Sequence, residues 1–262
     1  MKLYPIKTQI VKTGDNLSEV ILKSLKKQSL QLENNDMLAL TSKIVSQAEG
    51  RTADLKNVKP SEQARKLAEE FSLQLEYVEL ILREADKIYG GVDKAVLTLK
   101  NGILAPNAGI DNKNAPAGIA ILWPSNPEKS AGSIREEIRS KTGKRIAVLI
   151  VDSGLAPLRR GTAGFALAVA GFKPIRDRRG DDDLYGKKIL ITTHAVADDL
   201  ASAAHLLMGE AAERTPAVLI REAPVDFDEK TYGSADMMMP LKECIFMNAF
   251  ADTAVQHSRK RK

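Results

Sequence analysis

The chain has 262 residues and a formal net charge of +5, with 39 Lys and Arg against 34 Asp and Glu. Its length supports a substantial core without disulfides, and the lone Cys244 excludes an internal disulfide framework and indicates a reducing, cytoplasmic setting. No segment approaches the length of a membrane span, and residues 257–262 hold four of the positive charges, so the body is nearly neutral and lacks a strong nucleic-acid footprint.

The N-terminal part predicts a helix and then a short buried strand. Apolar residues recur at helical spacing from Leu17 to Leu25, and Asp15 or Asn16 can cap that helix. Met37 to Leu40 reads as a buried strand that ends in Thr41-Ser42-Lys43. Hydroxyls, a lysine and free backbone N–H groups at that point form a candidate phosphate cradle, although Ser and Thr are also ordinary strand-end residues.

The next part predicts scaffold helices, a hairpin and a polar loop. One helix begins at Pro60 and a second runs from Gln74 to Ile88, while Val96 to Leu104 alternates around the hairpin dipeptide Asn101-Gly102. The loop that follows places Asp111 among several asparagines. It is either a cluster of oxygen ligands or an ordinary turn rich in Asn and Asp.

A buried strand with a polar exit is the central feature of the sequence. A helix beginning near Ser130 or Ser133 and ending at Gly143 precedes it, with a second candidate anion site at the helix start. Residues 146–151 then form an apolar run that breaks into Asp152-Ser153-Gly154, with Arg159 and Arg160 following in a short loop. The alternative is a buried strand, a polar turn and a solvated basic loop.

The C-terminal part places an acidic residue directly after a helix. Ala197 to Met208 is strongly helical, and Gly209 ends this helix just before Glu210. A carboxylate at a helix C-terminus needs a nearby cation, which either a bound metal or Arg214 would supply. Strands are also expected at 188–193 and 217–220. Residues 177–186 form either a hydrophilic connection or a source of metal ligands, and no regular periodicity is present after residue 226.

Several common catalytic motifs are absent from the sequence. It contains no Walker A loop, no G-x-G-x-x-G, no H-E-x-x-H and no G-x-S-x-G, and its three histidines lack ligand spacing, so they read as bystanders. What remains is a set of oxygen ligands at the ends of elements: Asp111, Asp152 with Ser153, and Glu210. Such a set suits a hard divalent ion that is shared with phosphate. Lys43, Arg159 and Arg160 are candidates to neutralise phosphate or a carboxylate substrate.

Six segments, in this order, resemble the signature blocks of the coenzyme F-420 gamma-glutamyl ligases: TSKIVSQAEGR, NAGIDNKN, NPEKSA, VDSGLAPLRRGTAGFAL, DLYGKK and AVADDLASAAHLLMGE. The resemblance covers residues 4–222. It implies a mixed α/β fold particular to this family in an intertwined homodimer, neither ATP-grasp nor P-loop. We therefore expect a ligase-like domain over residues 1–225 and a C-terminal extension over 226–262 that carries the basic tail 257–262.

The resemblance also implies a reaction. Family members add L-glutamate to a deazaflavin precursor at the expense of GTP, through an acyl phosphate, in the cytoplasm. Two Mg²⁺ or Mn²⁺ ions are implied, with K⁺ as a further candidate, and no membrane or nucleic-acid partner is expected.

Carried over block by block, the resemblance assigns roles to particular residues. The ligands implied for one divalent ion are Asp111 and Asp152, and those for the second ion are Ser153 and Glu210. The positions that match nucleotide contacts are Ser42, Lys43, Asn114 and the backbone around Met208 and Gly209. Arg159 and Arg160, with Asp152, are the candidate catalytic residues.

The sequence also departs from the family pattern. Gln47 stands where the family often has a nucleotide-contacting Lys, which leaves the choice between GTP and ATP open, and Ser153 stands where Thr is frequent. Two alternatives therefore remain at this point. One is a related ligase that acts on another carboxylate, and the other is a non-enzymatic protein that binds nucleic acid through residues 258–262.

Overall fold

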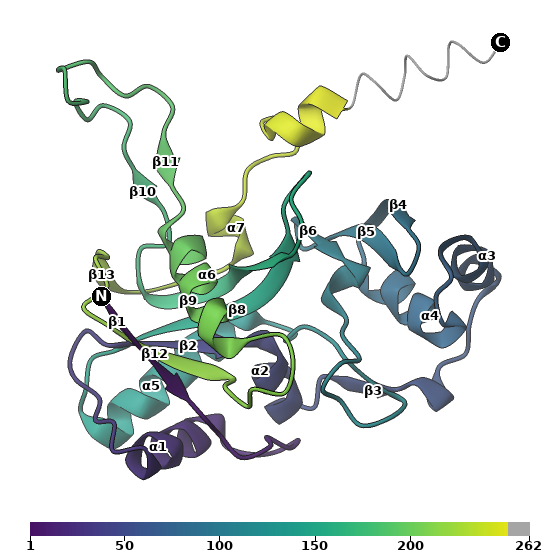
Figure 1. The fold of residues 1–262 in the computed structure, drawn as a ribbon, viewed down its shortest axis with the longest axis horizontal. Coiled ribbons are helices and arrows are strands. Elements are labelled where there is room, and N and C mark those ends of the chain that lie inside the picture. Colours follow the sequence, from purple (N-terminus) through teal and green to yellow (C-terminus); the bar gives the residue numbers. More distant parts are fainter. Residues whose placement is uncertain (251–262) are drawn as a thin grey trace.

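The computed structural model describes residues 1–250, and its centre is a six-stranded sheet with the order β1-β12-β2-β8-β9-β13 (Figure 1). β2 and β8 run parallel, and the other neighbouring pairs of this sheet are antiparallel. The strands are β1 (Lys2–Ile6), β2 (Met37–Thr41), β8 (Ala147–Leu155), β9 (Thr162–Phe172), β12 (Ala217–Arg221) and β13 (Phe227–Tyr232). The mixed α/β class expected from the sequence is confirmed.

Helices cover both faces of this sheet. On one face α1 (Leu17–Lys27), α2 (Ser42–Ala48) and α5 (Pro127–Thr142) share a buried apolar cluster with the strands, and on the other α6 (Val196–Met208) forms a second cluster (Figure 1). Because the central strands are covered on both sides, their sequences are almost continuously apolar, as the unbroken runs predicted.

Capping residues explain where two of these helices begin. The side-chain oxygen of Asn16 accepts a hydrogen bond from the backbone N–H of Glu19 at 2.9 Å, which confirms one of the two predicted caps of α1. The predicted start of α5 near Ser130 or Ser133 was wrong. Asn126 caps it earlier, accepting from Lys129 N at 2.8 Å, and proline suits the first helical position.

A smaller lobe with its own apolar cluster lies beside the main sheet. It contains the short 3₁₀ turn η1 (Leu55–Asn57), α3 (Glu62–Phe71), α4 (Leu75–Glu84), and the three-stranded sheet β4 (Lys87–Val92), β5 (Ala95–Lys100) and β6 (Ile103–Pro106). The predicted hairpin at Asn101-Gly102 is confirmed. The helix predicted from Gln74 forms as α4, but its predicted end at Ile88 was wrong. The backbone becomes extended at Ala85, and Ile88 belongs to β4, where it pairs with Thr98 of β5.

Two further short strands connect the lobe to the main sheet. β3 (Thr52–Asp54) pairs antiparallel with β7 (Ile119–Ile121), and the 3₁₀ turn η2 (Asn107–Gly109) precedes Asp111, which forms an isolated bridge with Ile121. This bridge attaches the polar loop around Asp111 to the end of β7.

Strand β8 is longer than the sequence suggested. The predicted break at Asp152 was wrong: the strand continues to Leu155, with Asp152 opposite Phe165 and Ser153 opposite Gly164 on β9. The register shifts between Ile150 and Val151, where a bulge re-aims the following side chains. Asp152 and Ser153 therefore sit on a hydrogen-bonded strand rather than on a free loop.

Residues 173–195 form an arm that projects from the body of the molecule (Figure 1). Its base is the antiparallel pair β10 (Arg176–Asp177) and β11 (Thr193–His194). The strand predicted over 188–193 was wrong, because Lys188 forms only an isolated bridge with Asp182 and the strand β11 begins at Thr193. The arm carries exposed apolar side chains at Leu184, Tyr185, Leu190 and Ile191.

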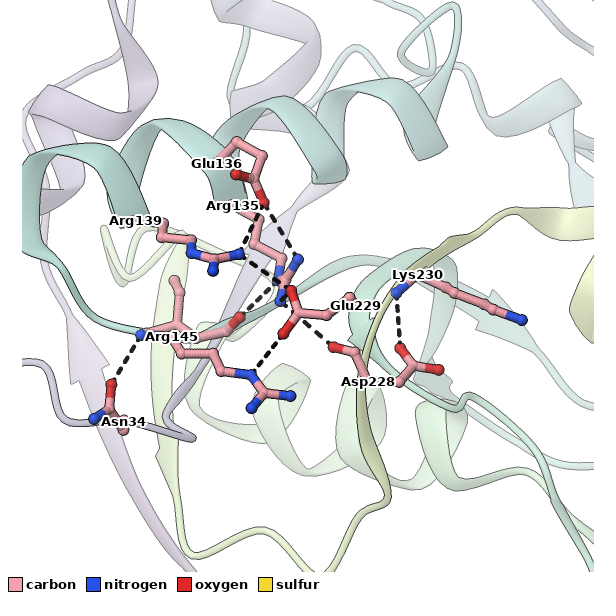
Figure 2. A network of polar contacts seen from close by, with 9 residues as sticks. Asn34, Arg135, Glu136, Arg139, Arg145, Asp228, Glu229 and Lys230 are labelled. Atoms are coloured by element: carbon pink, nitrogen blue, oxygen red, sulfur yellow. Dashed lines mark hydrogen bonds and ion pairs between the residues drawn. The ribbon is translucent and has the colours of Figure 1, made fainter.

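The chain after residue 226 also contains regular structure, which its lack of periodicity did not predict. β13 adds an edge strand to the main sheet, and α7 (Ser234–Met237) follows it. Three arginines surround Glu229 of β13, with Arg135 at 2.7 Å, Arg139 at 3.2 Å and Arg145 at 2.6 Å (Figure 2).

The boundary at residue 225 stays a prediction, and the basic tail 257–262 lies outside the described residues. Within residues 1–250, no helix is both long and apolar enough to cross a membrane.

Candidate active site

A cavity of about 430 Å³ opens where the start of α2, the C-terminal half of β8 and the C-terminus of α6 meet. The N-terminal segment 8–11 forms part of its wall. All the residues that the sequence assigned to metal or nucleotide line this cavity: Ser42, Lys43, Gln47, Asp111, Asn114, Asp152, Ser153, Met208, Gly209 and Glu210. These residues come from four separate parts of the chain, residues 42–47, 111–114, 152–153 and 208–210.

Lys43 and Asp111 form an ion pair at the cavity wall. The Lys43 Nζ atom lies 2.6 Å from Asp111 Oδ2 and donates a second hydrogen bond to the backbone carbonyl of Lys113 at 3.0 Å. Both side chains are only partly buried. The Lys43 ammonium group therefore already compensates the charge of the Asp111 carboxylate.

Asp152 carries a desolvated carboxylate. Its Oδ1 accepts the N–H of Ser153 at 2.8 Å, and its Oδ2 accepts a hydrogen bond from the indole N–H of Trp123. Burial raises the pKa of Asp152 to about 6, against the opposing effect of these two donors, and the nearby negative charge of Asp111 raises it further. The ionised form of Asp152 is therefore costly until a cation approaches.

Glu210 is held at the other side of the cavity by two donors. It accepts hydrogen bonds from Thr162 Oγ1 at 2.6 Å and from His205 Nε2 at 2.9 Å. Burial alone would raise the pKa of Glu210, but these hydrogen bonds lower it below its ordinary value. Arg214, which was one of the two cations considered for Glu210, does not pair with it within the described residues, and Thr162 and His205 donate to it instead. His205 is consequently not a bystander.

Asn114 ties the Asp111 loop to the end of α6. Its side-chain amide donates to the carbonyl of Ala211 at 2.8 Å, just past Gly209 and Glu210. The loop and the helix end are thus fixed relative to one another, and both border the cavity. Gln47 lines the same cavity from α2.

Arg159 and Arg160 do not line this cavity. They lie in the exposed connection between β8 and β9, residues 156–161. Their role toward a substrate or phosphate stays a prediction.

Sequence reasoning missed three residues that hold the site's carboxylates: Trp123, Thr162 and His205. His205 lies five positions before Glu210, and this spacing is the one signal that pointed to contact across a helix end. Trp123 gave a weaker signal, as the only tryptophan of the chain.

The oxygen ligands in the cavity fit a hard divalent ion that is shared with phosphate. Within residues 1–250, no three side chains of His, Cys, Asp and Glu lie close enough to enclose an ion by themselves. Mg²⁺ usually takes one or two carboxylates and fills its remaining positions with water and phosphate oxygens. Asp111, Asp152 and Glu210, together with the Ser153 hydroxyl, all line the cavity and are the residues that would hold such an ion.

The fold and the cavity together define a class. This is a mixed α/β protein whose cavity combines carboxylates, hydroxyls and a lysine, the groups required to bind a phosphate-bearing ligand with a hard cation. A family model described as F420-0:Gamma-glutamyl ligase matches residues 5–222. The chain belongs to this family.

Curated relatives cover most of the chain. A coenzyme F420:L-glutamate ligase of Methanopyrus kandleri is 42% identical over 212 residues, which is 80% of this chain and 82% of the relative. The relative with the same name from Methanothermobacter thermautotrophicus is 37% identical, over 90% of this chain and 94% of its own. That from Methanocaldococcus jannaschii is 37% identical, over 95% of this chain and 97% of its own.

Proposed function

We propose that this chain is a coenzyme F420:L-glutamate ligase, which forms an amide bond between L-glutamate and F420-0. The observation that carries the proposal is the family match over residues 5–222, which spans every residue of the cavity described above. Two relatives that bear this name are similar over 94% and 97% of their own length. The related ligase for another carboxylate and the nucleic-acid binder have no comparable support.

GTP is the proposed co-substrate, and the cavity wall supplies its contacts. Lys43 would neutralise a phosphate oxygen, while Ser42 and Asn114 would donate hydrogen bonds near the same group. Asp111 and Asp152 would hold one divalent ion, and Ser153 and Glu210 the other. When bound, these ions would neutralise the charge on the transferring phosphoryl group.

The reaction proposed for this site has two steps. A carboxylate oxygen of F420-0 attacks the γ-phosphorus of GTP, the bond to the leaving oxygen of GDP breaks, and an acyl phosphate forms. The amine of glutamate then attacks the acyl carbon, phosphate leaves, and the amine loses a proton to give the amide. The contribution of the chain's own residues is to hold the reacting groups in line within a partly enclosed cavity.

Product formation tests the proposal directly. Purified protein incubated with F420-0, L-glutamate, GTP and Mn²⁺ should yield F420-0 that is heavier by one or more glutamyl residues in mass spectrometry, with GDP and phosphate released. EDTA should stop the reaction, and excess Mn²⁺ should restore it. ATP in place of GTP tests the consequence of Gln47. No mass shift with either nucleotide would reject the proposed function.

A homodimer is the proposed assembly, and the projecting arm supports it. The arm, residues 173–195, places Leu184, Tyr185, Leu190 and Ile191 in water, with exposed fractions between 78% and 99%. Such a group of apolar side chains on a monomer's surface is typical of a contact with another chain. If two copies of the chain exchanged their arms, each copy would bury the apolar side chains of the other, as in an intertwined dimer.

Sedimentation measurements test the role of the arm. We expect the wild-type chain to sediment as a dimer, and the double variant Leu190→Ser with Ile191→Ser to dissociate at protein concentrations at which the wild type stays dimeric. The double variant Lys187→Ser with Lys188→Ser, on the same arm, is the matched control and should remain dimeric. A monomeric wild type at high concentration would contradict the proposed assembly.

A further inference from the structure

The single tryptophan of the chain stands directly behind Asp152. Trp123 is 3% exposed, and its indole N–H donates a hydrogen bond to Oδ2 of Asp152. The indole nitrogen is only a donor, so it favours the ionised carboxylate and cannot itself ligate a metal ion. Oδ1 of the same carboxylate accepts the Ser153 N–H at 2.8 Å. Each oxygen thus has one protein donor and keeps further acceptor capacity for the cavity.

The indole ring is held in place on several sides. Gly109 lies against one face, where its φ of +69° suits glycine and where any Cβ would collide with the ring. Phe165 meets the ring edge to face, with centroids 6.2 Å apart and planes at 61°. The Nζ atom of Lys100 lies 5.5 Å from the ring centroid, within the range of a cation–π contact. The orientation of the N–H is therefore fixed by packing.

Residues of the smaller lobe contact Trp123, and Trp123 in turn contacts Asp152. The carbonyl of Trp123 accepts a hydrogen bond from Arg51 Nε at 3.1 Å. Glu84, at the end of α4, then binds both Arg51 at 2.9 Å and Lys100 at 2.5 Å. The backbone and the ring of Trp123 are thus connected to the same carboxylate of the lobe.

We infer that Trp123 is a positioning residue for the divalent-ion site: it fixes the Asp152 carboxylate in the orientation that binds the ion. This inference rests on the proposed function of the site. Donors that orient a ligating side chain typically change metal affinity by about 10- to 100-fold when removed. Without the indole N–H, the Asp152 side chain keeps only the Ser153 N–H as a donor, so its orientation is less restricted and more order must be imposed when the ion binds.

Mn²⁺ binding without nucleotide or substrate gives the first test. We expect Trp123→Phe to raise the Kd for Mn²⁺ by about tenfold or more, measured from the electron paramagnetic resonance signal of free Mn²⁺. In turnover assays the Mn²⁺ concentration for half-maximal rate should rise by a similar factor, while the KM for glutamate stays unchanged. A Kd within twofold of the wild-type value overturns the inference.

Tyr232→Phe provides the matched control. The Tyr232 hydroxyl also donates to a carboxylate, that of Asp228, but on β13 and outside the cavity. This variant should bind Mn²⁺ as the wild type does. An equal loss of affinity in both variants would indicate a general effect on the fold and contradict a specific role of Trp123.

The wild-type protein itself offers a second test, which does not depend on any variant folding. Because Trp123 is the only tryptophan, its fluorescence reports on this one position. Paramagnetic Mn²⁺ bound at Asp152 should quench that emission strongly, and diamagnetic Mg²⁺ should compete and relieve the quenching. Unchanged emission at saturating Mn²⁺ would overturn the inference.

The two proposals fail in different ways. If Trp123→Phe weakens Mn²⁺ binding but the wild-type protein forms no glutamyl product with GTP or ATP, the proposed function fails and the positioning role stands. If product forms while Trp123→Phe leaves Mn²⁺ affinity unchanged, the proposed function stands and the positioning role fails.

Discussion

Asp152→Asn is expected to lower the rate of glutamyl transfer by about a hundredfold or more, while the metal-free protein stays folded with a melting temperature close to that of the wild type. Asparagine matches the shape of aspartate, but its single amide oxygen can accept only one of the two N–H groups that Asp152 accepts, and it lacks the charge needed to hold a divalent ion beside phosphate. Loss of one such electrostatic contribution commonly costs about 10²- to 10³-fold in rate. Mass-spectrometric product formation at saturating GTP and Mn²⁺ measures the loss.

The stability part of this prediction follows from the sign of the pKa change. Burial raises the pKa of Asp152 from 3.8 to about 6. The charged carboxylate therefore weakens the folded state at pH 7, and this penalty fades as the pH falls from 6 toward 4. Removing the charge relieves this penalty, but the asparagine loses one of the two hydrogen bonds. We therefore expect the melting temperature in EDTA at pH 7 to stay within a few degrees of the wild type, since ~1 kcal/mol corresponds to about 2 to 4 °C at this size.

Asp198→Asn is the matched control for Asp152→Asn. Asp198 is also a carboxylate whose pKa is raised by burial, and it accepts the N–H of Ala166 at 2.9 Å, but it does not line the cavity. It should tolerate the same substitution with turnover close to wild type. Turnover near the wild-type rate in Asp152→Asn would reject the assignment of Asp152 to the metal site.

Glu210→Gln is expected to raise the Mn²⁺ concentration needed for half-maximal activity by at least about tenfold. A neutral amide is a much weaker ligand for a hard cation than a carboxylate. The amide oxygen can still accept the hydrogen bond from Thr162, so the end of α6 should keep its structure. Activity titrated against Mn²⁺, with circular dichroism as the check of folding, separates lost metal binding from lost fold.

Glu213→Gln controls for the charge at this position. Glu213 accepts the N–H of Ala211 at 2.8 Å only a few residues away, but its side chain does not line the cavity. The Glu213 variant should need no more Mn²⁺ than the wild type. If the two variants behave alike, the effect comes from the net charge of the region, and Glu210 is not a ligand.

The sequence predicted those elements whose pattern is set by burial alone. β2, the first half of β8 and α6 face apolar neighbours on their buried sides, and the residues show it. Pairing with distant strands determined the elements that the sequence pattern did not predict. Ile88 follows a helical pattern but pairs in β4, and β8 continues through Asp152 and Ser153 because β9 pairs with both residues. Local composition does not contain that information.

The residues of the candidate site that could be predicted are polar side chains at the ends of helices and strands. Asp111, Asp152 and Glu210 were singled out as polar residues beside apolar runs, and the family resemblance indicated that they meet. Trp123 was not predicted, because its importance depends on Gly109 and Phe165 leaving the ring one orientation. Such a constraint exists only in three dimensions.

The strand β13 has a consequence for how the protein can be shortened. A chain ending at residue 225 would leave β9 as an open edge with unpaired backbone groups, ready to bind a strand from another molecule. It would also remove Glu229 from Arg135, which is 4% exposed and would keep its charge in a largely dry environment. The segment beyond the family match thus protects the ligase fold from self-association, and truncated protein should aggregate before it loses its active site.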